Sequence, residues 1–170
     1  ILVGCTQTYE TTQTVELEDV EETTVEVDTH WKDWELTDLN TDKIFTINDY
    51  EGTPVLVESF AVWCPTCTKQ QKNIKEFHEK YGELAVSISL DTDENENEAK
   101  IKDHTNKNEF DRIYAISPNE VTQQLIEEYG LTIVSAPSVP IILICEDGST
   151  RLMKGLKTAD ELKQEVENGC

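Results

Sequence analysis

The chain has 170 residues, of which 37% are hydrophobic and 29% charged, enough apolar material for the core of one domain. No stretch approaches the roughly 20 consecutive apolar residues that cross a bilayer, which excludes a membrane-spanning segment within these residues. The formal net charge is -21, from 14 Lys and Arg against 35 Asp and Glu. A charge of that sign repels phosphate backbones and argues against nucleic acid as a partner.

The first residues are Ile1-Leu2-Val3-Gly4-Cys5, with no methionine. Leu-Val-Gly-Cys resembles a lipobox, the end of a signal peptide before a cysteine that becomes lipid-modified. We therefore expect residues 1–5 to be a signal-peptide stub and Cys5 to be the lipidation site. The alternative is an apolar terminus with an incidental cysteine.

Residues 6–30 are rich in Thr, Asp and Glu and contain no Lys or Arg. Such a composition buries too little apolar surface to offset the entropy lost on ordering. We expect an acidic tether here, followed by one folded domain at residues 31–170. The alternative is an added edge strand, since residues 15–18 and 25–28 alternate apolar and acidic side chains.

The first half of the domain predicts a hairpin, a strand buried on both faces, a helix that stops at Gly82, and a second buried strand. Their expected ranges are 34–47, 55–63, 64–81 and 84–90. The second half predicts a short polar helix, a strand, a helix, an antiparallel hairpin and a closing helix. Their expected ranges are 99–107, 112–116, 120–129, 141–154 and 158–167. This order favours an α/β fold with a central mixed β-sheet and helices on both faces.

The segment Trp63-Cys64-Pro65-Thr66-Cys67 stands where the first buried strand meets a helix. A helix N-terminus favours an anion, so the Cys64 thiol should ionise more readily than an ordinary thiol. Cys67 lies one helical turn further on and can reach the Cys64 sulfur. The spacing therefore predicts a redox pair in which Cys64 is the nucleophile and Cys67 resolves the mixed disulfide.

Two other interpretations of this pair are open. A zinc site needs four ligands, but the other cysteines are isolated and the three histidines are scattered along the chain. An inert structural disulfide between Cys64 and Cys67 closes too small a loop to contribute much stability. We expect no metal and no cofactor.

The segment VLVESFAVWCPTC, residues 55–67, resembles the active-site strand and helix of the thioredoxin superfamily. The preceding hairpin, residues 34–52, resembles the TlpA/ResA-type branch, whose members are extracytoplasmic and often membrane-tethered. The resemblance covers roughly residues 31–168 and implies a thioredoxin-like fold with an N-terminal β-hairpin. Pro65-Thr66 replaces the Gly-Pro that is common in reducing thioredoxins, which leaves the redox potential open.

The resemblance implies roles for further residues. Glu58 matches a buried carboxylate that shuttles the proton of Cys67; the alternative is a strand-end charge that reaches solvent. Pro140 matches a cis-proline facing the cysteines, with Val139 pairing with a client segment. The alternatives are a trans bond, or Pro137 in this role. Trp63 matches an aromatic flank of the site, or else a partly buried core residue, and Pro65 and Thr66 complete the expected substrate-binding set.

The other two cysteines of the domain and the acidic segment 91–98 are not assigned a catalytic role. Cys145 is interpreted as a small buried hydrophobic residue and Cys170 as incidental, although bridges from Cys170 to Cys5 or to Cys145 stay open. The acidic segment 91–98 lacks the spacing of a calcium loop and is expected to be a solvated loop.

These patterns favour an extracytoplasmic thiol–disulfide oxidoreductase, monomeric and held on the outer face of the cytoplasmic membrane by a lipid at Cys5, or soluble if the lipobox is wrong. Its partners would be protein thiol or disulfide clients and a membrane or soluble dithiol electron partner. One alternative is a non-catalytic client-binding module. A peroxiredoxin-like peroxidase is disfavoured, because Val57 and Ala61 stand where its Pro and Thr or Ser would precede Cys64.

Overall fold

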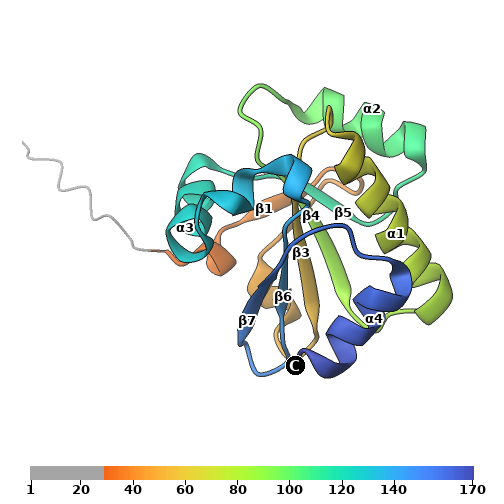
Figure 1. Cartoon of the computed structure of the whole chain (residues 1–170). Helices are drawn as coiled ribbons and strands as arrows, with labels where there is room; N and C mark the ends of the chain where they lie inside the picture. Colours follow the sequence, from red (N-terminus) through yellow and green to blue (C-terminus); the bar gives the residue numbers. More distant parts are fainter. Residues whose placement is uncertain (1–28) are drawn as a thin grey trace, which may run out of the picture.

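The structure, a computed structural model, describes residues 29–170. Our expectations for Cys5 and for an edge strand within residues 15–28 lie outside these residues, as does nearly all of the expected tether. The described residues form a five-stranded sheet with helices on both faces and a separate two-stranded hairpin (Figure 1). The predicted α/β fold with a central mixed sheet is confirmed.

The five-stranded sheet has the order β5-β4-β3-β6-β7. Its strands are β3 (Val55–Phe60), β4 (Val86–Asp91), β5 (Ile113–Ile116), β6 (Ile141–Ile144) and β7 (Thr150–Met153). Strands β3, β4 and β5 are parallel, whereas β6 runs antiparallel to β3 and β7 antiparallel to β6. Every residue of β3 is buried, as expected for a central strand covered on both faces.

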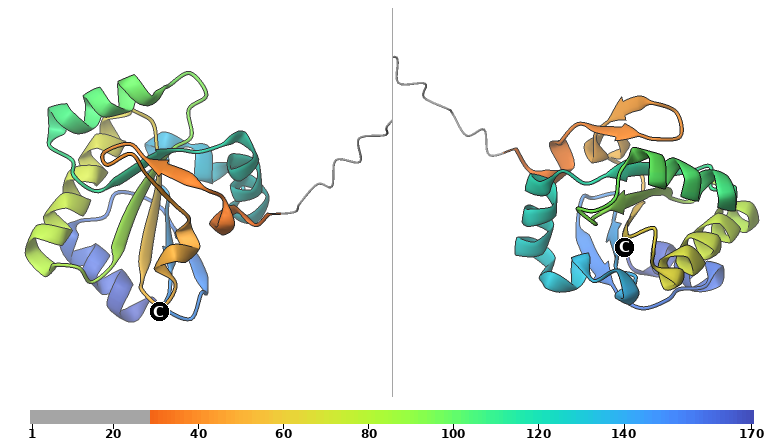
Figure 2. Two further views of the ribbon diagram at one scale, coloured as in Figure 1. Left: turned by 180° about the vertical axis from the view of Figure 1, so that it is seen from behind. Right: turned by 90° about the horizontal axis from the view of Figure 1, so that it is seen from above.

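The helices are α1 (Pro65–Tyr81), α2 (Glu98–Asn108), α3 (Asn119–Tyr129) and α4 (Ala159–Asn168). Figure 2 shows α1 and α4 on one side of the sheet and α3 on the other. Two buried clusters correspond to these layers: Leu56 and Phe77 pack with α4 on one face, and Val57 packs with Leu125 of α3 on the other. None of the helices in residues 29–170 is both long and apolar enough to span a bilayer.

The hairpin pairs β1 (Leu36–Asp38) antiparallel with β2 (Lys43–Phe45), as predicted. The other predicted elements lie within two residues of their observed bounds, with one exception. The strand expected at 55–63 ends at Phe60, because a tight turn in which Ala61 O accepts the Cys64 N–H at 3.1 Å redirects the chain into α1.

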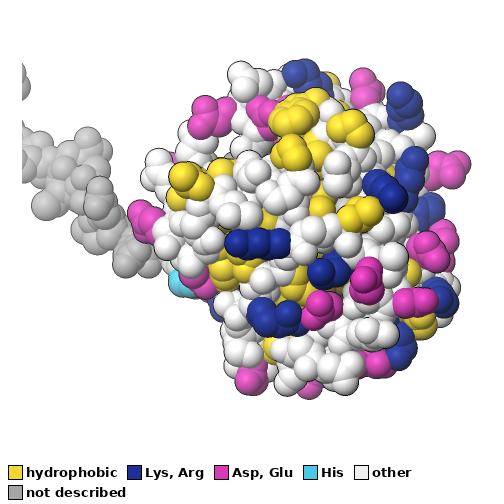
Figure 3. Space-filling model, viewed as in Figure 1, with side chains coloured by type: hydrophobic (Ala, Val, Ile, Leu, Met, Phe, Trp, Pro, Cys, Tyr) yellow, Lys and Arg dark blue, Asp and Glu magenta, His cyan; other side chains and the backbone are white. Residues whose placement is uncertain are grey.

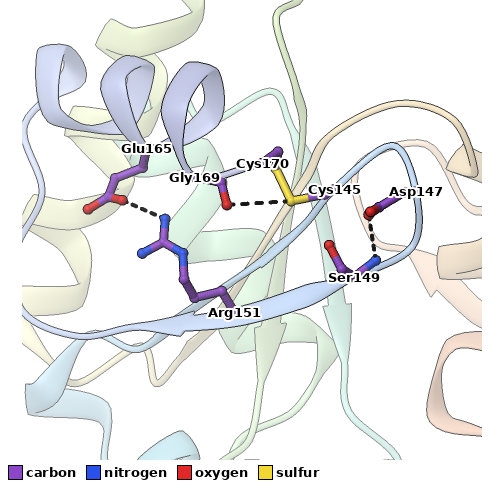
Figure 4. Close-up of a disulfide and its surroundings, with 7 residues drawn as sticks. All are labelled: Cys145, Asp147, Ser149, Arg151, Glu165, Gly169 and Cys170. Carbon is purple, nitrogen blue, oxygen red and sulfur yellow. Dashed lines mark hydrogen bonds and ion pairs between the residues drawn. A yellow bond between two sulfur atoms is a disulfide. The ribbon is translucent and has the colours of Figure 1, made fainter.

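Cys145 and Cys170 form a disulfide, with their Cα atoms 5.4 Å apart (Figure 4). The interpretation of Cys145 as only a small buried hydrophobic residue and of Cys170 as incidental is therefore wrong, and of the two bridges left open the structure contains Cys145–Cys170. Helix α4 packs on the sheet and ends beside the end of β6, which brings two cysteines 25 residues apart into bonding range. This proximity comes from the packing of α4, which no spacing in the sequence encodes.

Candidate active site

Cys64 and Cys67 meet at the C-terminal end of β3, as the sequence predicted. Cys64 is the N-cap of α1, and its Sγ accepts the N–H of Cys67 at 3.1 Å. Pro65 occupies the first helical turn and is exposed, and Thr66 is half-buried. Neither Cys64 nor Cys67 is in a disulfide in the structure. A thiolate at Cys64 would thus face a backbone donor at a helix N-terminus, where negative charge is stabilised.

Both sulfurs are held inside the domain. Cys64 is 1% exposed and Cys67 is fully buried. The Sγ of Cys67 donates to the carbonyl oxygen of Ala136 at 3.1 Å. Burial raises the pKa of the Cys67 thiol well above its ordinary value, and its hydrogen bond with Cys64 and the charge of Glu58 act in the same direction. Cys67 is therefore a protonated thiol at neutral pH, and it needs a base before it can act as a nucleophile.

Glu58 supplies a carboxyl group in this interior. It points to the face of β3 covered by α1, is completely buried, and its Oε2 accepts a hydrogen bond from Ser89 Oγ at 3.1 Å. Its Oε1 has no hydrogen-bond partner among the described residues. Burial raises the pKa of Glu58 to about 8, against a smaller lowering by Ser89 and Gln71. The alternative that Glu58 reaches solvent is wrong, and a carboxyl with this pKa can both take and give a proton near neutral pH.

The expected cis bond before Pro140 is wrong, because residues 29–170 contain no cis peptide; this also applies to the bond before Pro137. The chain turns instead through Val139 itself, which has φ 40° and ψ 60°. Few β-branched residues adopt this left-handed conformation. The Val139 N–H bonds back to Ala136 O at 2.9 Å, so this donor is not free to pair with a client.

The turn nevertheless lies where it was expected. Val139 and Ala136 belong to the same buried cluster as Cys64 and Cys67. The carbonyl oxygen of Pro140 accepts the N–H of Ser59 at 3.2 Å, which fixes the turn beside β3. Val139 and Pro140 are therefore next to the cysteine pair, in a geometry different from the predicted one.

Trp63 is 60% exposed, so the alternative of a partly buried core residue is wrong. Its indole Nε1 donates to Asp93 Oδ2 at 2.5 Å. The carboxylate of Glu96 accepts the N–H of Val62 at 2.7 Å and that of Trp63 at 3.4 Å. The acidic loop after β4 thus holds the residues immediately before Cys64.

Our sequence interpretation missed this contact, because it treated segment 91–98 as a solvated loop. A signal was available: the loop follows β4, the parallel neighbour of β3, and the carboxyl ends of parallel strands share one edge of a sheet, where sites form. Asp93 and Glu96 are therefore part of the surroundings of the cysteine pair.

Comparison with solved structures finds proteins of similar fold. A secreted Mycobacterium tuberculosis disulfide oxidoreductase homologous to E. coli DsbE is 12% identical with a TM-score of 0.64, covering 81% of this chain and 96% of that one. The exposed lipoprotein thioredoxin of Streptococcus pneumoniae is 19% identical with a TM-score of 0.64, covering 79% and 97%. StoA from Bacillus subtilis is 17% identical with a TM-score of 0.61, covering 77% and 93%.

These similarities show a thioredoxin-like fold. No curated protein matches the chain. The Redoxin family model matches residues 16–154, which is most of the sequence. The chain therefore belongs to the Redoxin family.

Proposed function

We propose that this protein is a thiol–disulfide oxidoreductase of the TlpA/ResA type, which exchanges electrons with protein cysteines through Cys64 and Cys67. The observation that carries the proposal is the geometry of the cysteine pair. The Cys67 N–H donates a hydrogen bond to the Cys64 sulfur at 3.1 Å, and the Cys67 thiol is buried, where its burial and the charge of Glu58 raise its pKa. Both electrons reside on the sulfurs, so the chemistry requires no cofactor.

In the reducing direction, the Cys64 thiolate attacks one sulfur of a client disulfide. A Cys64–client S–S bond forms, the client S–S bond breaks, and the departing client thiolate takes a proton from water. The Cys67 thiol then loses its proton and attacks the Cys64 sulfur. The second client thiolate leaves and takes up a proton, so the client gains two electrons and two protons and the Cys64–Cys67 pair is oxidised.

Glu58 fits the second step. The Cys67 thiol cannot ionise easily where it is buried, and the ionised form of Glu58 can accept its proton. With a pKa of about 8, Glu58 is available in both forms at neutral pH. The dithiol partner that restores the Cys64–Cys67 pair would be another protein, in the membrane or soluble.

Single substitutions separate the attack by Cys64 from the resolution by Cys67. Cys64→Ser is expected to abolish reduction of a disulfide-bearing peptide, because the attacking sulfur is lost. Cys67→Ser should still attack but should accumulate the Cys64–peptide mixed disulfide, detected by mass spectrometry without reductant. Activity that survives in Cys64→Ser would contradict the proposal.

The burial of both sulfurs favours one alternative, a module that binds clients with little turnover. A Cys64→Ser/Cys67→Ser variant that keeps client binding, together with a parent protein that shows no reversible two-electron couple in thiol buffers, would establish that alternative. If a couple is found, its potential gives the direction. A value near about -270 mV indicates a reductase, and one near about -120 mV a disulfide donor.

We also propose an extracytoplasmic location with a lipid anchor at Cys5. The Cys145–Cys170 disulfide supports the location, because such bonds persist in oxidising compartments. Two structural neighbours are described as secreted and as an exposed lipoprotein. Mass spectrometry of the protein from its native membrane should find Cys5 as the first residue and carrying acyl chains; an unmodified Cys5 preceded by an intact upstream segment would refute the anchor.

A further inference from the structure

A groove opens beside the cysteine pair. Its volume is about 330 Å³, and its lining includes Trp63, Ala61 and Ala136, together with the acidic Asp93 and Glu94. Ala136 lines the groove and its carbonyl oxygen accepts the hydrogen bond of Cys67, so the groove lies next to the cysteine pair. Figure 3 shows hydrophobic side chains with acidic ones beside them at the top of the molecule, over the end of the sheet where the loop after β4 lies.

A second cavity, of about 220 Å³, is lined by residues of the same loop. Asp93 and Glu94 line it too, together with Asp91 and Glu96. Among the described residues, the lining of the two cavities therefore includes four carboxyl groups and no Lys, Arg or His. The nearby Lys100 is engaged with the loop backbone, since its Nζ donates to Asn95 O at 2.9 Å.

Asp91 adds a buried carboxyl to the second cavity, which shares Asp93 and Glu94 with the groove. Its side chain is 1% exposed, and its Oδ1 accepts the N–H of Asp93 at 3.0 Å. Its Oδ2 has no hydrogen-bond partner within residues 29–170. Burial raises the pKa of Asp91 to about 7, and the charge of the Glu96 side chain and a hydrogen bond with it act in the same direction. Asp91 therefore holds a proton over much of the neutral range, and a cation entering the cavity would favour its ionised form.

The shape of the site favours an organic cation over a metal ion. In the described part of the chain, no three His, Cys, Asp or Glu side chains are placed to hold a metal. A Lys or Arg side chain fits better, because its apolar stem can lie along the exposed face of Trp63 while its charged end reaches the carboxylates of the loop.

We infer that the groove lined by Trp63, Asp93 and Glu94 binds client segments that carry a Lys or Arg close to the reactive cysteine. This inference rests on the proposed oxidoreductase function and names its client class: basic segments, with the loop after β4 recognising the charge. Complementary charge of this kind increases the rate of productive encounter more than it increases affinity.

The test uses three peptides of equal length, each with one cysteine joined to 2-mercaptoethanol by a disulfide and flanked by Lys, Ser or Glu. The reduced protein should reduce the Lys peptide at least about 10-fold faster than the Glu peptide at low salt, and added salt should shrink this ratio. In Asp93→Asn/Glu94→Gln the ratio should fall to the smaller value that long-range attraction by the remaining net charge gives. The amide oxygen introduced by Asp93→Asn can still accept the Trp63 N–H, so the change is mainly one of charge.

The matched control removes two charges at the opposite end of the sheet, in Glu51→Gln/Glu146→Gln, both exposed. This variant corrects for long-range attraction by the net charge of -21 and should keep the parent ratio. Equal rates for the three peptides, or a preference that the groove variant keeps, would overturn the groove alone. If the protein reduces none of the three peptides and does not reduce the neutral bis(2-hydroxyethyl) disulfide either, the oxidoreductase function is overturned, and the groove with it.

Discussion

Replacing Glu58 by Gln is expected to slow the resolution of the mixed disulfide by on the order of 100-fold at pH 7, within the range of general acid–base catalysis. Gln has nearly the same shape but cannot accept the proton of the buried Cys67 thiol, whose pKa is raised well above its ordinary value. The first step, attack by Cys64, should change far less. Stopped-flow single-turnover measurements with a fluorescent peptide disulfide separate the two steps.

The pH profile distinguishes proton transfer from a packing defect. Because the ionised form of Glu58 is the proposed base, the resolution rate of the parent should rise with pH and level off above the carboxyl pKa of about 8. Ser89→Ala offers a graded comparison, since the Ser89 hydrogen bond lowers the pKa of Glu58 and its loss should move the inflection to higher pH. Equal resolution rates and an unchanged inflection in Glu58→Gln would exclude the assigned role.

The same substitution has a second readout in stability. The folded-state pKa of Glu58, about 8, lies above the ordinary value of 4.5 that applies to the unfolded chain. Between these values the unfolded chain has released a proton that the folded protein keeps, so the stability present below pH 4.5 is progressively lost as the pH rises to about 8. The amide in Glu58→Gln cannot ionise, so the variant should lack this decline and be more stable at pH 7 by about 3 kcal/mol. Urea unfolding at several pH values measures how the free energy of unfolding changes with pH in the parent and in the variant.

The sequence was sufficient for the parts of the site that short-range patterns encode. An apolar run of strand length, interrupted by Glu58 and followed by Cys64 and Cys67, specifies a buried strand, a helix start and a buried acid. The helix start and the acid are where the pattern predicts, and the strand ends three residues earlier than predicted, at Phe60. The N-cap position of Cys64 and the place of Pro65 in the first turn follow from local backbone preferences alone.

What the sequence did not predict depends on tertiary packing. Asp93 and Glu96 contact the residues before Cys64 only because β4 lies parallel to β3 in the sheet. The Val139 turn is set by neighbours that hold a β-branched residue in a left-handed conformation, against its own preference. The Cys145–Cys170 pairing likewise depends on where α4 ends. The sequence left bridges from Cys170 to Cys5 or to Cys145 open and could not choose between them.

That disulfide carries the second large effect. Cys170→Ser is expected to lower the free energy of unfolding by about 3 kcal/mol, because the bond closes a loop with a sequence separation of 25 and restricts the unfolded chain. For a protein of this size the midpoint of thermal unfolding should fall by about 6–12 °C. Cys170 is the residue to replace, since Cys145 is buried in a cluster with Leu162 and Val166, and a hydroxyl there would add a separate cost.

Two controls isolate the covalent bond from other effects. The parent protein in strong reductant should lose the same stability as Cys170→Ser, and reductant should cost the variant nothing further. Equal unfolding midpoints for the oxidised parent and the variant would show that the bond does not stabilise the fold. Cys145 follows the end of β6, which pairs with the start of β3. It therefore lies at the end of the sheet opposite to Cys64, which follows the end of β3. The reduction potential of the Cys64–Cys67 pair should therefore stay unchanged, because the structural disulfide and the proposed redox pair lie at opposite ends of the sheet.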